Sequence, residues 1–119
     1  MKLAITSQEE GIQSALDPRF GRARYFVVVD LATNAVSTVS NTVNLGAAQG
    51  AGIQAAKTLV DLGVKALLTG HVGPKAFSAL QAGGVAIYPV AGDTVAEALA
   101  HYKAGSLKAM TSADVEGHW

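Results

Sequence analysis

Residues 67–77 read LLTGHVGPKAF, and this segment combines a strand, a tight loop and the start of a helix. The residues before Thr69 are apolar, as in a buried strand. Pro74 suits the first helical position, because the N–H that proline lacks has no helical partner there in any case. Apolar residues then recur at helical spacing from Ala76 to Leu80. We therefore predict a strand–loop–helix unit, which is a building block of α/β folds.

The loop inside this unit supplies the first group of candidate binding residues, which are Gly70, His71, Val72 and Gly73. A strand, a tight glycine loop and a helix N-terminus are the parts of an anion site, because free N–H groups and the positive end of the helix dipole meet there. We predict an anion site here, with His71 in the loop. The alternative is that the glycines only close a tight turn and that His71 is solvated.

A second group of candidates lies in the sequence RFGRAR, which holds all the arginines of the chain. The candidates are Arg19, Phe20, Gly21, Arg22 and Arg24. Guanidinium groups present several donors in a planar fork and suit multivalent anions, while a neighbouring glycine allows close approach. The alternative is a solvated surface loop.

The segments on either side of the arginines predict strands. Residues 3–6 form a short apolar run, and residues 25–30 are β-branched or aromatic apart from the final aspartate. Residues 35–40 predict an edge strand with one wet face, with Val36, Thr38 and Ser40 on one side and Ser37 and Val39 on the other. The short link between residues 30 and 35 predicts an antiparallel hairpin.

Gly50 and Gly52 open a helix that we expect to end near Gly63. They do not complete a dinucleotide-binding fingerprint, because position 55 is alanine rather than glycine. We predict that both glycines allow a ligand to approach this helix start. The alternative is tight packing between the helix and the sheet.

The rest of the chain predicts repeated helix–strand units. Residues 62–68 and 82–88 match each other if one inserted glycine is allowed, and each reads as a helix end followed by a buried strand. Residues 94–97 (TVAE) have the pattern of a capping box before a third helix. Such units have parallel strands and right-handed crossovers. We predict a mixed five-stranded sheet with one antiparallel strand, helices on its faces, and the loops after strands one, four and five at one end.

The composition excludes several classes of protein. The chain of 119 residues has a formal net charge of zero, which argues against a nucleic-acid binder. It has no cysteine, which excludes zinc–thiolate sites and cysteine-ligated iron–sulfur clusters. It shows no signal-peptide pattern and no apolar run of about 18 residues, so we expect a cytoplasmic protein with no membrane partner.

The sequence also lacks the patterns of common catalytic sites. It has no nucleophile elbow, no P-loop and no histidine pair at metal-site spacing, and the first strand carries no acidic residue. We therefore expect a binding protein rather than an enzyme.

Three segments together resemble one known family. They are residues 17–23 (DPRFGRA), 50–56 (GAGIQAA) and 69–77 (TGHVGPKAF). Together they resemble the dinitrogenase iron–molybdenum cofactor biosynthesis family, which includes NifX, NafY and the C-terminal part of NifB, and within it an orange-protein branch. The resemblance extends to about residue 110, so it implies one cluster-binding domain over residues 1–110 and a C-terminal tail over residues 111–119.

The resemblance implies a fold and a cargo. The fold is a three-layer α/β/α arrangement of the ribonuclease H-like kind, without nuclease activity. The cargo is an anionic metal–sulfur cluster, bound non-covalently: iron–molybdenum cofactor or a precursor, or the molybdenum–copper sulfide of the orange-protein branch. In the setting of this resemblance, His71 is the candidate metal ligand, and partners for delivery would be cluster-assembly or ATPase proteins. A different hypothesis is that the same helix N-termini bind or sense a small phosphorylated metabolite, which would be colourless.

Overall fold

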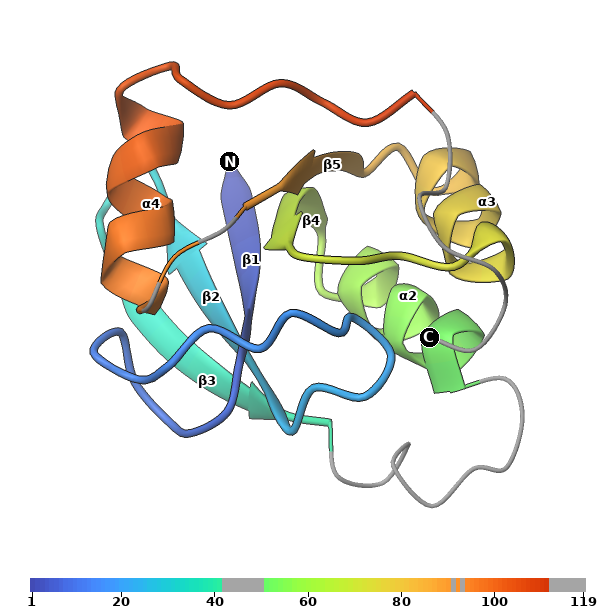
Figure 1. Cartoon of the computed structure of the whole chain (residues 1–119), viewed down its shortest axis with the longest axis horizontal. Helices are drawn as coiled ribbons and strands as arrows, with labels where there is room; N and C mark the ends of the chain where they lie inside the picture. Colours follow the sequence, from blue (N-terminus) through green and yellow to red (C-terminus); the bar gives the residue numbers. More distant parts are fainter. Residues whose placement is uncertain (42–50, 91, 93, 112–119) are drawn as a thin grey trace.

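The computed structural model describes residues 1–41, 51–90, 92 and 94–111. Gly50 and the end of the C-terminal tail therefore lie outside the described residues. The described residues form five strands and three helices (Figure 1): β1 (Lys2–Ser7), β2 (Tyr25–Asp30), β3 (Val36–Ser40), α2 (Ala51–Asp61), β4 (Val64–Thr69), α3 (Pro74–Ala82), β5 (Ala86–Pro89) and α4 (Val95–Lys103).

The strands form one sheet in the order β3-β2-β1-β4-β5. β1, β4 and β5 pair in parallel, whereas β2 is antiparallel to both β1 and β3. β2 is thus the one strand that runs against the other four. The predicted mixed sheet with one antiparallel strand is confirmed, including the hairpin of β2 and β3.

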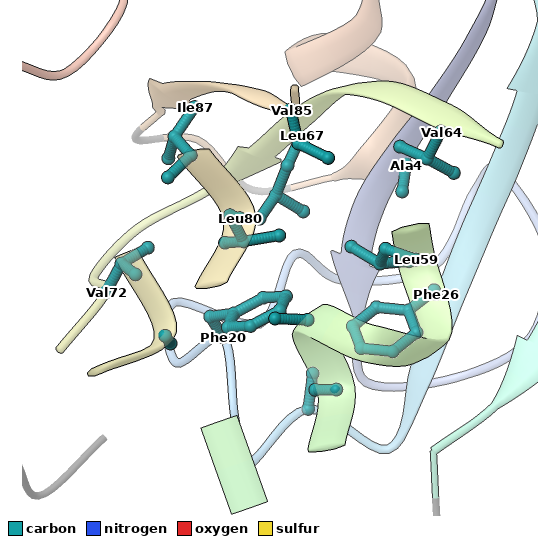
Figure 2. Packing of buried hydrophobic residues seen from close by; sticks show 14 of the residues in the cluster. Ala4, Phe20, Phe26, Leu59, Val64, Leu67, Val72, Leu80, Val85 and Ile87 are labelled. Carbon is teal, nitrogen blue, oxygen red and sulfur yellow. The ribbon is translucent and has the colours of Figure 1, made fainter. Parts of the chain in front are cut away.

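Helices cover both faces of the sheet, which gives the three layers. One core cluster packs α2 and α3 on residues such as Ala4 and Leu67, and Figure 2 shows its side chains. The other packs α4 on residues such as Leu3 and Ile5. Side chains alternate between the two faces along a strand, so consecutive residues of β1 enter different clusters. Every residue from Leu3 to Ser7 is buried because the sheet centre is covered on both sides.

The inserted glycine of the second repeat has a packing role. Gly63 and Gly84 both have a φ of 78° and follow a helix end, so they are the equivalent pair. Gly83 is the additional residue, and a Cβ there would lie 2.3 Å from Cγ2 of Val60 on α2. The end of α3 can therefore approach α2 closely only because Gly83 has no side chain.

The segment after α4 crosses the β5 edge of the sheet, as Figure 1 shows. Leu107 packs against the cluster on the α4 side and Met110 against the cluster on the other side. The Met110 N–H donates to the carbonyl of Ile87 in β5 at 2.7 Å. The packed core thus extends to Met110. Within the described part of the chain, no helix has the length and hydropathy needed to cross a membrane.

Candidate functional site

The sheet topology brings the candidate loops to one end of the molecule. The parallel strands β1, β4 and β5 end at the same side of the sheet. The antiparallel register pairs Ser7 with Tyr25 and Tyr25 with Ser40, so the start of β2 and the end of β3 lie there too. The loop 8–24 and the β4–α3 loop both reach this end, as the sequence predicted. Ligands of open α/β sheets bind at the carboxyl ends of their strands.

Residues 17–24, which we call the arginine loop, pair through their backbone with residues 70–73, which we call the glycine loop. The Phe20 N–H donates to the carbonyl of His71 at 3.2 Å, and the His71 N–H donates to the carbonyl of Pro18 at 2.7 Å. Arg19 and His71 thereby form a parallel bridge. Residues that are far apart in the sequence become neighbours, and both Arg19 and His71 are exposed.

Gly70 makes this pairing possible. A Cβ at Gly70 would lie 2.6 Å from the carbonyl oxygen of Pro18 and 2.8 Å from its Cα. The space beside Gly70 is filled by the backbone of the arginine loop, so the missing side chain at this position serves the pairing of the two loops.

Two of the candidate binding residues, Phe20 and Val72, have side chains that anchor their loops in the core. The Phe20 and Val72 side chains are 0% exposed and belong to the cluster beneath α2 and α3, where Figure 2 shows them. The Phe20 ring stacks on Phe26 with centroids 5.7 Å apart. Both side chains hold their loops on the protein and do not reach solvent. Sequence reasoning missed this because an isolated aromatic residue among arginines also suits a ligand site.

The remaining glycines of the prediction occupy different positions. Gly21 and Gly73 are buried in their loops, and Gly52 lies inside α2 and is partly buried. Gly73 precedes α3 in an extended conformation, and within the described ranges no side chain caps this helix start. Pro74 occupies the beginning of α3, as predicted.

Two of the three arginines share a surface depression. Arg19 and Arg24 line a hollow of about 340 Å³ together with Gln8, Glu9, Asp17 and Pro18. Arg22 is partly buried and is not among the lining residues. The backbone carbonyl of Arg24 accepts from the Asn41 N–H at 2.8 Å, which ties this arginine to the end of β3.

Asp17 is a residue of the site that the sequence analysis did not select. It is 3% exposed, and its Oδ1 accepts from the Arg19 N–H at 2.9 Å and lies 3.6 Å from Arg19 Nε. The Thr6 hydroxyl donates to the carbonyl of Asp17 at 2.6 Å and lies 2.9 Å from the Thr69 hydroxyl. The Asp-Pro pair indicates a turn, and an Asp side chain that accepts two residues onward is a common turn element. That signal could have identified Asp17 as the partner of Arg19.

The donor set at this end does not suit a bare metal ion. Among the described residues, no group of three or more histidines, cysteines, aspartates or glutamates is placed to hold one. The chain has no cysteine anywhere. The exposed guanidinium groups and the uncapped start of α3 suit an anion whose metal atoms already carry their own ligands.

Comparison with known proteins gives consistent matches over nearly the whole chain. The sequence profile described as dinitrogenase iron–molybdenum cofactor matches residues 1–105. The apo form of the orange protein from Desulfovibrio gigas superposes with a TM-score of 0.93 at 42% identity, covering 96% of each chain. A NifB-like protein from Thermotoga superposes with a TM-score of 0.85 at 36% identity, covering 98% of each chain. An uncharacterized protein of Methanocaldococcus jannaschii is 27% identical over 111 residues, which are 91% of this chain and 90% of that protein.

Proposed function

Because the chain belongs to the dinitrogenase iron–molybdenum cofactor family, we propose that it binds and carries an anionic molybdenum-containing metal–sulfur cluster and catalyses no reaction. The observation that carries the proposal is the backbone bridge between Arg19 and His71 at the carboxyl end of the sheet. This bridge places the arginine loop next to the start of α3, which no described side chain caps. The cargo is a molybdenum–copper sulfide or an iron–molybdenum cofactor precursor. Cluster-assembly or ATPase proteins are the class of partner that would exchange it.

A thiometalate cluster suits this surface for a physical reason. Its charge is spread over a bulky surface of sulfide, so it needs distributed positive charge and N–H donors more than one strong ligand. Arg19 and Arg24 supply the charge, and the first turn of α3 supplies N–H groups near the positive end of the helix dipole. Since the chain has no cysteine, the sulfide must arrive with the cluster.

Cluster loading tests the proposal directly. The apo protein is mixed with tetrathiomolybdate and a copper salt and is then desalted. We expect visible absorbance and both metals to elute with the protein. A protein that retains no chromophore but binds phosphate esters would contradict the proposal and would favour the phosphorylated-metabolite hypothesis.

The arginine contribution is tested by charge removal. A charge-assisted hydrogen bond contributes roughly 1.5–3 kcal/mol, so Arg19→Ala combined with Arg24→Ala should reduce cluster retention at least tenfold. Adding Arg22→Ala should reduce it further. Lys65→Ala is the matched control, because Lys65 is exposed near the start of β4 at the other end of the sheet. Equal loss in the Lys65 variant would show that only overall charge matters.

His71 separates an electrostatic site from a coordinating one. If guanidinium and backbone donors hold the cluster, His71→Ala has a smaller effect than the arginine variants, and high salt loosens the cluster. If His71 binds metal directly, His71→Ala abolishes retention and salt has little effect. The absence of catalysis is tested with DNA, RNA and nucleotides. Metal-dependent cleavage that disappears on replacing one carboxylate would contradict it.

A further inference from the structure

The depression that holds Arg19 and Arg24 is not uniformly positive. Its lining residues also include Glu9 and Asp17, so the two formal positive charges are matched by two negative ones. The run of arginines in the sequence alone suggests a purely positive surface. A multivalent anion that enters here therefore comes near two acidic residues as well as two arginines.

The Asp17 carboxylate is fixed in place. It is almost fully buried, and it accepts from the backbone N–H of Arg19 at 2.9 Å while its Oδ1 lies 3.6 Å from Arg19 Nε. An anion that binds to Arg19 must share this guanidinium with Asp17 or replace the carboxylate as its partner. Glu9 is exposed, and its backbone carbonyl accepts from the Ser7 hydroxyl, which holds its position next to the end of β1.

We propose that Glu9 and Asp17 exclude compact oxyanions such as phosphate and molybdate, and so determine the specificity of the site for a larger anion with diffuse charge. A compact oxyanion concentrates its charge on small, strongly hydrated oxygens, so nearby carboxylates repel it strongly and dehydration is costly. A sulfide-covered anion is larger and less hydrated, and its charge centre stays farther from the carboxylates. The identity of this large anion rests on the proposed function, whereas the exclusion is a property of the chain itself.

Isothermal calorimetry tests the exclusion. Inorganic phosphate or molybdate is titrated into the wild-type protein, Asp17→Asn, Glu9→Gln and the double variant. Asparagine keeps an Oδ1 that can accept from the Arg19 N–H, so only the charge is removed. We expect at least tenfold tighter oxyanion binding in the double variant. Glu10→Gln is the matched control, because Glu10 is exposed and adjacent in sequence but does not line the depression. It should change the affinity by less than twofold.

A parallel titration with tetrathiomolybdate measures selectivity. Its affinity should change less than that of the oxyanions, so the preference for thiomolybdate falls in the double variant. The inference would be overturned if the affinity for all the anions changed equally. It would also be overturned if neither Glu9→Gln nor a folded Asp17→Asn gained affinity for the oxyanions. If no variant binds thiomolybdate while the carboxylate variants still gain oxyanion affinity, the proposed cargo is wrong and the exclusion stands.

Discussion

The β4–α3 and β5–α4 connections leave the same end of the sheet. They differ in the hydrogen-bond acceptors that they provide for the first N–H groups of the helix that follows. At α4, the Glu97 N–H donates to the Thr94 hydroxyl at 3.2 Å, and the Thr94 N–H donates to the Glu97 carboxylate at 3.1 Å. The Val95 and Ala96 N–H groups donate to carbonyls of the loop 8–24. The N–H groups in the first turn of α4 therefore already have acceptors within the protein.

Among the described residues, no side chain caps the start of α3. Gly73 has no side chain with which to cap, and Pro74 follows it. The same long loop that provides acceptors for α4 through residues 12–14 places Arg19 next to the loop that leads into α3. The difference between the two helix starts supports the proposal that α3, which lacks a side-chain cap and lies next to an arginine, is the one that binds an anion.

The largest expected effect comes from the anchor that holds the arginine loop beside α3. Replacing Phe20 with alanine removes a fully buried ring stacked on Phe26, and should lower the free energy of unfolding by about 3–5 kcal/mol. Urea denaturation measures it, with Phe20→Leu as the milder control. A loss below 1 kcal/mol would mean that the loop does not depend on this anchor.

Alanine substitutions at Gly70 and Gly92 compare the two connections directly. Gly70→Ala places a methyl group against Pro18 and should destabilise the protein by about 1–3 kcal/mol. It should also speed hydrogen exchange at the His71 N–H, because the loop pairing is disturbed. Unchanged exchange would show that the two loops do not need this close approach.

Removing the cap at α4 should affect stability alone. Thr94→Ala should cost about 1 kcal/mol of unfolding free energy, because the Glu97 N–H loses its side-chain acceptor. Cluster retention should stay at the wild-type level. A parallel loss of retention would place the cargo at both helix starts and would break the contrast between the two connections.

The smallest effect is expected at Gly92 in the β5–α4 connection. A Cβ there meets nothing within 4 Å, and its φ is not in the left-handed region. Gly92→Ala should therefore stabilise the protein by about 0.4–1 kcal/mol, because alanine lowers the conformational entropy of the unfolded chain. Thermal unfolding measures this change beside that of Gly70→Ala. Similar losses in both variants would show that glycine is needed equally in the two connections.

Much of the fold could be predicted from the sequence because its signals are local. The strand at Tyr25–Asp30, Pro74 at the start of α3 and the capping box at Thr94 each depend on residues close together in the chain. The site could be predicted only in part. Arg19 and His71 were both selected, but nothing in their separate motifs indicates that their backbones pair.

The sequence by itself determined the elements, their order and the absence of thiolate ligands, because periodicity, caps and composition act within a few residues. The tertiary structure decided which of the candidate residues are exposed at this end of the sheet. It buried Phe20 and Val72 and filled the space beside Gly70 with Pro18. It also set Asp17 against Arg19 in the depression shared with Glu9 and Arg24. Such choices depend on contacts between distant segments, and burial and charge pairing exist only once the sheet has brought those segments together.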